Sequence, residues 1–464
     1  MTAACQLAIH DAGLTSLPNP DLVAVVDLLS WRSANPARAV ARGLGISPRS
    51  TGLTTMGGNG PQTLVNEVAA CIQRGELDLA LLTGGEARRS QRRARAEGLN
   101  PWPKDPDATP PDRTIGDSFV MASQEEIRRG VTMPVQFYPL FESAIRAESG
   151  RSPAEHTGHI ARLWADFARV AADNPNAWIR TAPSAEDIAT PGPTNRMVGL
   201  PYTKSMNSNN DVDQSAALVM CSAQQATDLG VARDRWVFPL SGTGCREHPY
   251  VSQRWSFTDT PAIRCGGQLA LTLAETDIDG VELIDLYSCF PSAVHLGATS
   301  LNISTDRQLT RTGGLCFAGG PWNNYSMHAI ATMMNDLRDR PGARGLVWAN
   351  GGFVTKHAFG VYATEPGAHG FRYGSPQAQI DSLPSRVLAS PTEAAEATGP
   401  TRVEAYTVMH DRDGQPETVI CSGLLADGRR AWGTSSSPDV ARTFTEGEWV
   451  GRAVSLSDNG TVLA

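Results

Sequence analysis

The chain has 464 residues, a length that predicts two or three domains rather than one compact unit. Its formal net charge of -8 argues against nucleic acid as a general partner. No apolar stretch approaches the roughly 20 residues that span a bilayer, and the chain begins with no basic-then-apolar export signal. We therefore expect a soluble, cytoplasmic protein that binds no membrane. The eight cysteines form no Cys-x-x-Cys pair, so the sequence predicts neither a disulfide framework nor a zinc ribbon.

The chain opens with a helical pattern over residues 1–13, and a strand-like run follows at residues 22–29. A doubly wound α/β unit normally opens with a strand, and no strand-like run precedes this helix. Either the fold lacks that strand or the native chain starts further upstream.

A glycine loop at residues 54–63 comes next, in the run Thr-Thr-Met-Gly-Gly-Asn-Gly-Pro-Gln-Thr. An apolar helical pattern follows from Leu64 to Ile72, and a buried-strand run at residues 79–82 then leads to Gly84-Gly85. This order of loop, helix and strand resembles an active-site elbow whose nucleophile is missing.

The sequence changes character after this strand. A basic run, a proline-rich loop and two helical patterns predict a helical insertion at residues 87–200, lying over the first α/β unit. Strand-like runs return at residues 202–207 and 216–221, and a helix follows them to Gly230. We therefore expect the first unit to span residues 1–230.

The second half of the chain repeats the same order. Gly319-Gly320-Pro321 opens a helical pattern, and a buried-strand run at residues 345–349 leads to Gly351-Gly352. The repeat predicts two packed α/β units, the second at residues 231–365. A connector rich in proline, glycine and alanine follows at residues 366–400.

The tail, residues 401–464, predicts a small antiparallel barrel. Turn residues at 411–414 and 427–428 separate short runs rich in β-formers. These runs lie at residues 402–409, 418–425, 430–433 and 449–456.

Over residues 1–365 the order of these loops resembles the thiolase superfamily, and in detail the type-1 thiolase-like proteins related to sterol-carrier-protein thiolases. This resemblance implies an α/β protein with a duplicated thiolase fold, two αβαβα units, and a helical loop insertion. The tail resembles the oligonucleotide/oligosaccharide-binding (OB) type of barrel appended to the type-1 proteins. Such a barrel implies a topology and not nucleic-acid binding.

The resemblance also says where thiolase chemistry should lie. Thiolases need a cysteine nucleophile at a helix N-terminus, and the matching position here is Gly57. The histidine that activates the nucleophile falls on Gly320, and the acid/base cysteine falls on Ala349. The histidine of the oxyanion motif falls on Tyr287, in the run Tyr-Ser-Cys-Phe. Four such departures argue against Claisen condensation or thiolysis by the family mechanism.

Four residues remain as candidates for catalysis. The hydroxyl of Tyr287 either moves a proton or holds a carbonyl oxygen, or it packs at the domain centre with one hydrogen bond. Cys289 and Cys316 are either displaced nucleophiles or buried inert thiols, and the inert reading is favoured. His328, early in its helix, either points into the pocket or lies at the edge of the core.

The glycines around the missing nucleophile predict a binding pocket. Backbone amides at a helix start can stabilise an anion, so we expect coenzyme A or an acyl-CoA as ligand, with no required cofactor. The basic run that includes Arg92 and Arg93 either contacts the phosphates of coenzyme A or forms a solvated face. Lys356-His357 either contacts a phosphate or carboxylate or lies on an exposed strand edge. The candidate binding residues are Gly57, Gly58, Asn59, Gly319, Gly320, Asn350, Gly351, Arg92 and Arg93. His156 and His159 have metal-ligand spacing, but no third ligand lies close by in the chain, so we expect no metal.

Three functions therefore stay open. The first is an acyl-CoA-binding protein of lipid metabolism, of the acyltransferase superfamily and similar to acetyl-CoA acetyltransferase, but impaired in that reaction. The second is a retro-aldol lyase that uses Tyr287 on a β-hydroxyacyl-CoA, as the resemblance to steroid side-chain aldolases implies. The third is a non-enzymatic lipid carrier or scaffold whose barrel recruits a protein partner. The resemblance implies a homodimer, whereas the added barrel and the absent first strand argue against that dimer, so a homodimer and a monomer both stay open.

Overall fold

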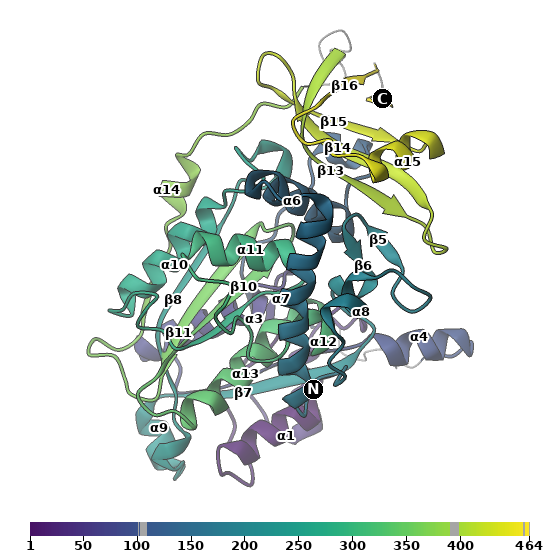
Figure 1. Cartoon of the computed structure of the whole chain (residues 1–464). Helices are drawn as coiled ribbons and strands as arrows, with labels where there is room; N and C mark the ends of the chain where they lie inside the picture. The colour runs from purple at the N-terminus through teal and green to yellow at the C-terminus, as the bar shows by residue number, and fades with distance from the viewer. Residues whose placement is uncertain (101, 103–108, 390–398, 458–459, 464) are drawn as a thin grey trace.

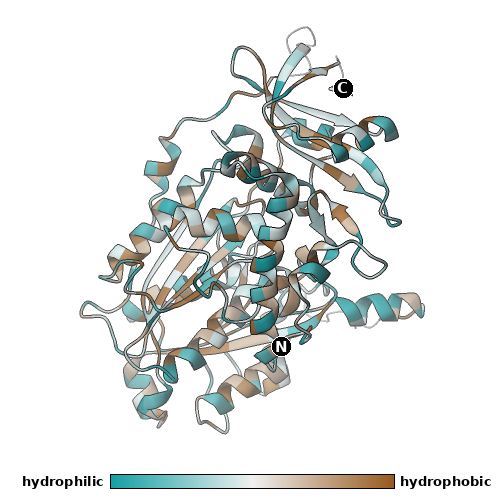
Figure 2. Ribbon diagram, in the orientation of Figure 1, coloured by the Kyte–Doolittle hydropathy of each residue, from teal (hydrophilic) through white to brown (hydrophobic). Residues whose placement is uncertain are grey.

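The computed structural model describes residues 1–464 except 101, 103–108, 390–398, 458–459 and 464. Two five-stranded sheets lie face to face, with helices between them and on their outer faces, and a third sheet forms a separate end of the molecule (Figure 1). Figure 2 shows the hydrophobic strands at the centre and hydrophilic residues on outer helices. No helix among the described residues is long and apolar enough to cross a membrane.

The first sheet has the strand order β4-β2-β1-β3-β7. Its first four strands in that order are parallel and β7 is antiparallel to β3. Alternate side chains of β1 face opposite layers, since Leu22 and Ala24 join the main core whereas Val23 and Val25 pack with the outer helices. The strands are β1 (Leu22–Val25), β2 (Ser50–Thr54), β3 (Leu79–Ala87), β4 (Arg113–Ile115) and β7 (Asp213–Cys221). Helices α1 (Thr2–Asp11) and α2 (Pro36–Leu44) cover the outer face.

The second sheet has the order β12-β8-β11-β10-β9. Here β9 and β10 are parallel, and β11 is antiparallel to both of its neighbours. The strands are β8 (Phe238–Arg246), β9 (Leu283–Leu286), β10 (Arg344–Gly351), β11 (Lys356–Ala363) and β12 (Arg372–Gly374). Helices α10 (Pro261–Leu273) and α11 (Pro291–Ser300) lie on this side of the molecule, and α14 (Gln377–Asp381) follows β12.

Helices α3 (Gly60–Gln73) and α13 (Tyr325–Arg338) pack against each other between the two sheets. Each follows a glycine-containing loop and leads into a buried strand, β3 in the first half and β10 in the second. Each of these strands then pairs with an antiparallel neighbour. The duplicated α/β fold expected from the repeated loops is confirmed.

The insertion between the first sheet's strands contains the longest helix of the described residues, α7 (Pro153–Asp173), beside α6 (Pro134–Ser149). Both begin with proline in the first turn, which suits a position that lacks a partner for its N–H. The other elements of the segment are α4 (Arg88–Ala96), α5 (Gln124–Arg128), α8 (Ala185–Ala189), β5 (Met197–Gly199), β6 (Tyr202–Thr203) and the short 3-10 helix η1 (Lys204–Met206). Short helices elsewhere are α9 (Ala223–Asp228), η2 (Arg233–Arg235), η3 (Val251–Gln253), α12 (Gly314–Phe317) and η4 (Trp322–Asn324).

The C-terminal segment forms an antiparallel sheet in the order β15-β14-β13-β16-β17, and β5 of the insertion pairs with β13. An isolated bridge between Thr434 and Thr461 joins the two ends of this order. Helix α15 (Pro438–Glu446), which the sequence reading did not anticipate, buries Ala441 and Phe444 against the sheet. The strands are β13 (Gly399–His410), β14 (Pro416–Leu424), β15 (Arg430–Ser435), β16 (Ala453–Leu456) and β17 (Val462–Leu463).

A buried arginine fixes the C-terminal sheet to the α/β core. The Arg430 side chain is fully buried, donates to Glu404 at 2.8 Å and donates to the backbone oxygen of Ser252 at 2.9 Å. Beside it, the indole of Trp432 donates to the Ser252 hydroxyl at 2.9 Å. These contacts cross from the third sheet to the 3-10 helix η3 after β8, so the sheet is held in a defined place.

Candidate functional site

The first glycine loop meets a loop from the other half of the chain. The backbone N–H of Gly57 donates to the side-chain oxygen of Asn323 at 3.1 Å, and the Asn323 amide donates to the Asp27 backbone oxygen at 2.9 Å. Gly57 has φ +148°, a conformation that side chains disfavour. Further along, the hydroxyl of Ser326 donates to the Gly58 backbone oxygen at 3.1 Å. The two halves therefore join at the position where the sequence predicts a pocket.

Gly58 leaves room for Tyr287. A Cβ at residue 58 would overlap the Tyr287 hydroxyl and would lie 2.5 Å from the backbone oxygen of Asn350. Tyr287 is buried, and no hydrogen bond joins its hydroxyl to another residue in the described part of the chain. Burial raises the pKa of Tyr287 well above its ordinary value. The phenol is therefore a neutral group that can donate a proton or a hydrogen bond.

Two asparagine side chains line the same place. A Cβ at Gly351 would overlap the side-chain oxygen of Asn59, whose amide donates to Thr63 at 3.1 Å. The Asn350 amide donates to the Tyr138 hydroxyl at 2.8 Å. The side-chain oxygens of both asparagines are buried, and neither has a hydrogen-bond partner among the residues described. The structure thus brings together six of the residues expected at the pocket, namely Gly57, Gly58, Asn59, Tyr287, Asn350 and Gly351.

Lys356 places a cation beside this loop. A Cβ at Gly57 would lie 3.0 Å from the Lys356 Cε atom. The ammonium donates to the backbone oxygens of Met56 at 2.5 Å and Asp117 at 3.1 Å. Burial lowers the pKa of Lys356. The reading of Lys356-His357 as an exposed strand edge is wrong, because β11 is an interior strand and both side chains are buried in it.

The two candidate cysteines are thiols in apolar surroundings. Burial raises the pKa of Cys289 to about 12, and burial also raises the pKa of Cys316. The Cys316 sulfur accepts a hydrogen bond from the Trp164 indole at 3.1 Å. Since the thiolate is the nucleophilic form, this arrangement favours the inert reading for both.

Tyr138 connects the Cys289 loop to the turn after β10. Its ring stacks on Phe290, with ring centroids 4.4 Å apart, and its hydroxyl donates to the Gly352 backbone oxygen at 3.1 Å. The sequence reading missed this residue. Its only local signal was a place in the apolar pattern of α6, which does not distinguish it from an ordinary core tyrosine.

The other two family positions have different neighbours. Ala349 is fully buried in β10 and pairs with Ala358 of β11. The Gly320 N–H donates to the Asn209 backbone oxygen at 2.9 Å, and a Cβ there would overlap the Ser208 hydroxyl. The Gly319-Gly320 loop therefore packs against the segment before β7, not against Gly57.

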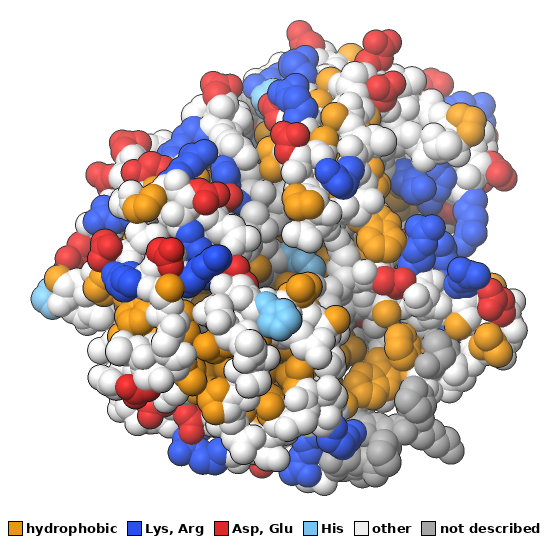
Figure 3. Space-filling model, turned by 90° about the horizontal axis from the view of Figure 1, so that it is seen from below, with side chains coloured by type: hydrophobic (Ala, Val, Ile, Leu, Met, Phe, Trp, Pro, Cys, Tyr) orange, Lys and Arg blue, Asp and Glu red, His pale blue; other side chains and the backbone are white. Residues whose placement is uncertain are grey.

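His328 lines a separate cavity of about 780 Å³ between α1, β7 and α13, which Gly319 also lines. Figure 3 looks onto this lower side of the molecule and shows hydrophobic side chains gathered on it. Burial lowers the pKa of His328 to about 4, so its imidazole is neutral at pH 7. The structure does not bring this candidate to the Tyr287 site.

The basic run lies on α4, which projects from the body of the molecule (Figure 1). Arg92 pairs with Asp211 at 2.5 Å and Arg93 pairs with Glu97 at 3.1 Å, and both arginines are largely exposed. These surface pairs are typical of a solvated charged face.

Comparisons with known proteins agree with this architecture. A protein-family profile described as the thiolase-like protein type 1 additional C-terminal domain matches residues 377–461. A crystal structure of a monomeric SCP2-thiolase-like protein type 1 from Mycobacterium smegmatis is 33% identical, with 100% of this chain and 94% of that chain covered and a TM-score of 0.85. No curated protein matches the chain.

Two more distant structures share the fold. The dimeric peroxisomal thiolase of Saccharomyces cerevisiae is 14% identical, over 78% of this chain and 86% of that chain, with a TM-score of 0.54. The Ltp2-ChsH2(DUF35) aldolase is 18% identical, over 78% of this chain and 91% of that chain, with a TM-score of 0.58. This chain is 33% identical to the Mycobacterium smegmatis protein over its whole length, and it shares the duplicated fold and the additional C-terminal domain. It therefore belongs to the SCP2-thiolase-like protein type 1 family.

Proposed function

We propose that this protein binds an acyl thioester of coenzyme A where the two halves meet at Gly57 and Gly58, and that it does not carry out thiolase chemistry. The observation that carries the proposal is a set of buried polar atoms around this loop that lack hydrogen-bond partners within the described residues. The set includes the side-chain oxygens of Asn59 and Asn350. Buried polar groups are normally paired, so such a set indicates a place for a polar ligand or water.

The groups present suit a thioester with an amide-containing arm. The Tyr287 phenol and the Lys356 ammonium are donors for a carbonyl oxygen. The free side-chain oxygens of Asn59 and Asn350 are acceptors for the amide N–H groups of the pantetheine arm. Each added hydrogen bond of this kind contributes on the order of 1 kcal/mol.

The same geometry argues against thiolysis. The nucleophile position carries no side chain at Gly57, and the candidate thiols Cys289 and Cys316 are held neutral by burial. The imidazole of His328 lines another cavity. Without a thiolate and its base, an acyl group has no acceptor on the protein.

Calorimetry and turnover test the proposal together. We expect titration with acetoacetyl-CoA to give saturable binding, and addition of free coenzyme A to that complex to give no acetyl-CoA. Turnover at the rate of an ordinary thiolase would contradict the second half of the proposal. Absence of heat with both coenzyme A and acetoacetyl-CoA would contradict the first half, and would leave the scaffold function, with a partner recruited through the C-terminal sheet.

A second candidate, retro-aldol cleavage of a β-hydroxyacyl-CoA, is favoured by the Tyr287 hydroxyl, which has no hydrogen-bond partner in the part of the chain that the structure describes. In that reaction the Cα–Cβ bond breaks, the β-hydroxyl loses its proton as an aldehyde or ketone leaves, and the enolate of the acyl-CoA gains a proton at Cα. A neutral phenol beside the thioester oxygen would stabilise the enolate. The Ltp2-ChsH2(DUF35) aldolase has a similar fold.

Incubation with a β-hydroxyacyl-CoA and detection of the released carbonyl compound test this candidate. We expect the native protein to release product, and the rate of release to fall at least about 10-fold in Tyr287→Phe. Loss of one hydrogen-bond donor to a developing charge commonly lowers the rate by that much or more. No product, or product that Tyr287→Phe leaves unchanged, removes the lyase from consideration.

A further inference from the structure

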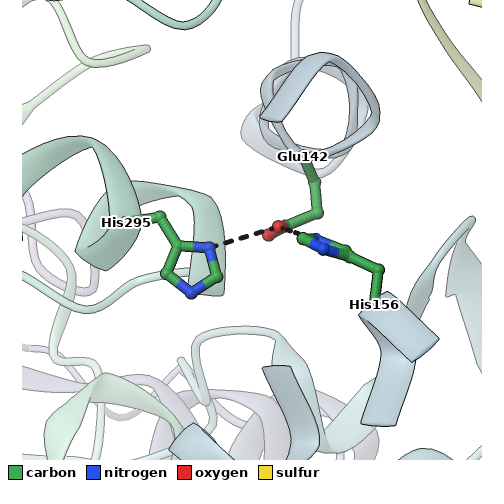
Figure 4. Close-up of side chains that lie close together, drawn as sticks. All are labelled: Glu142, His156 and His295. Atoms are coloured by element: carbon green, nitrogen blue, oxygen red, sulfur yellow. Dashed lines mark hydrogen bonds and ion pairs between the residues drawn. The ribbon is translucent and has the colours of Figure 1, made fainter. Parts of the chain in front are cut away.

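Three helices bring a carboxylate and two imidazoles to one point inside the protein (Figure 4). Glu142 comes from α6, His156 from α7 and His295 from α11, and one ligand atom of each lies within 4.8 Å of the others. The Glu142 Oε1 atom lies 2.5 Å from His156 Nε2 and 3.5 Å from His295 Nδ1. Glu142 and His156 are fully buried, and His295 is 7% exposed.

The imidazoles in this cluster are incompletely paired. Neither ring nitrogen of His295 has a hydrogen-bond partner among the described residues, and the same is true of His156 Nδ1. Burying a polar atom without a hydrogen-bond partner is unfavourable. Apolar side chains in this space would give a stable core without unpaired polar atoms. The imidazole nitrogens found there instead indicate a ligand that accepts nitrogen lone pairs.

The carboxylate is held in one orientation by groups behind it. The Tyr202 hydroxyl donates to Glu142 Oε2 at 2.5 Å and lies 2.9 Å from the Ser292 hydroxyl. The other carboxylate oxygen, Oε1, faces the two imidazoles.

We propose that Glu142, His156 and His295 bind a divalent transition-metal ion of the Zn²⁺ class. Two imidazoles and a carboxylate form a known three-residue ligand set for this ion. Tetrahedral ligands at about 2.0–2.1 Å from Zn²⁺ stand roughly 3.3–3.5 Å apart. The 3.5 Å between Glu142 and His295 already fits, and the Glu142–His156 pair opens by about 1 Å when the ion replaces their hydrogen bond. The His156 proton then resides on Nδ1.

A fourth imidazole lies beside the cluster. His159 is half-buried, follows His156 by three residues on α7, and stacks on His295 with ring centroids 5.3 Å apart. Because His159 is half-buried, it lies between the buried cluster and the surface of the protein.

The metal would join elements that also shape the Tyr287 site. His295 lies on α11, which begins at Pro291, immediately after the Tyr287–Phe290 run. Phe290 stacks between Tyr138 and Tyr202, with centroids 4.4 Å and 5.7 Å away. The ion therefore fastens α6, α7 and α11 behind the candidate pocket, and its binding is independent of the proposed acyl-CoA ligand.

Metal retention by the full-length protein tests the proposal. The protein is treated with chelator, incubated with an excess of Zn²⁺, desalted and analysed for zinc by mass spectrometry. Expected is about one zinc per chain, a rise in melting temperature with Zn²⁺, and, with Co²⁺ in its place, the visible absorption of a four- or five-coordinate ion.

Variants locate the bound ion. Glu142→Gln keeps the shape of the side chain and removes its charge, and His295→Ala removes an imidazole whose nitrogens accept or donate no hydrogen bond among the described residues. We expect both to weaken Zn²⁺ binding by more than about 100-fold, beyond the effect of losing an outer partner. His248→Gln is the matched control, because His248 also has a buried, unpaired nitrogen but lies outside the cluster. Circular dichroism and the melting temperature without metal establish that each variant is folded.

The result that supports the proposal is stoichiometric zinc in the native protein and in His248→Gln, with loss in either folded cluster variant. No retained zinc in the native protein would overturn it. So would zinc retained equally by Glu142→Gln and His295→Ala, since the ion would then be bound adventitiously at the surface.

Discussion

The hydroxyl of Tyr287 occupies the space that a side chain on Gly58 would need. The two residues come from different halves of the chain, and the backbone oxygen of Asn350 closes the same space from a third direction. Glycine at residue 58 is therefore what allows the Tyr287 phenol to lie against this loop.

Gly58→Ala should destabilise the protein. The new methyl group meets the Asn350 backbone oxygen at 2.5 Å, which cannot move cheaply, as well as the Tyr287 hydroxyl. Overpacking of this kind costs about 1–3 kcal/mol. Urea unfolding measures the loss, with Gly192→Ala as control, since nothing lies within 4 Å of a Cβ there. Equal stability of the two variants would show that the glycine loop is more open than described.

Gly57→Cys should not restore thiolysis. Residue 57 has φ +148°, and the new side chain would press on Lys356 Cε at 3.0 Å. A side chain in such backbone geometry costs on the order of 1–3 kcal/mol, and no imidazole of the described site faces it. Acetyl-CoA formation from acetoacetyl-CoA and coenzyme A is the measurement. Turnover comparable to a thiolase would mean that only the nucleophile was missing.

Asp285 should make stability fall as the pH rises. Burial raises the pKa of this carboxyl to about 6, although Arg311 N–H donates to it at 2.8 Å. In the unfolded chain the pKa of this carboxyl is about 3.9, so the folded state binds the proton more tightly than the unfolded state does. This proton binding stabilises the folded protein fully below about pH 4, and the stabilisation is lost as the pH rises through 6. Relative to Asp285→Asn, the free energy of unfolding should fall by up to about 3 kcal/mol between pH 4 and 7. Parallel pH profiles for the two proteins would contradict this.

Arg430→Ala should loosen the C-terminal sheet from the core. The substitution removes the hydrogen bonds that the buried guanidinium donates to Glu404 and to the backbone oxygen of Ser252. Breaking a buried ion pair commonly costs about 3–5 kcal/mol. Limited proteolysis should release a C-terminal fragment faster from this variant, whereas Arg442→Ala, at an exposed pair with Asp439, should behave like the native protein. Equal cleavage of all three would show that Arg430 does not hold the sheet.

Much of the fold follows from local sequence. The glycine loop at Gly57, the helix after it and the strand that leads to Gly84 are set by spacing and apolar periodicity, and the structure forms them as a turn before α3, as α3 itself and as β3. The same holds for α13 and β10 in the second half. Helix α15 was missed because nine residues between two strands give a short pattern, although Ser437-Pro438 is a usual helix start.

The site depends on contacts that no local pattern contains. Lys356 is buried because β11 lies between β8 and β10, an order that only the assembled sheet determines. His156 had no third ligand nearby in the chain, and the structure places Glu142 and His295 beside it from two other helices. Local spacing cannot reveal a cluster whose members approach each other only through helix packing.

Calorimetry that compares an acyl thioester with free coenzyme A tests the central claim most directly. If the Tyr287 phenol donates to the thioester oxygen, Tyr287→Phe should weaken acetoacetyl-CoA binding by about 3- to 10-fold and leave coenzyme A binding unchanged. Tyr406→Phe is the matched control, because the Tyr406 hydroxyl donates to Gly447 in the C-terminal segment. No binding of either ligand to the native protein, or equal losses for both ligands in Tyr287→Phe, would contradict a thioester site at the glycine loop.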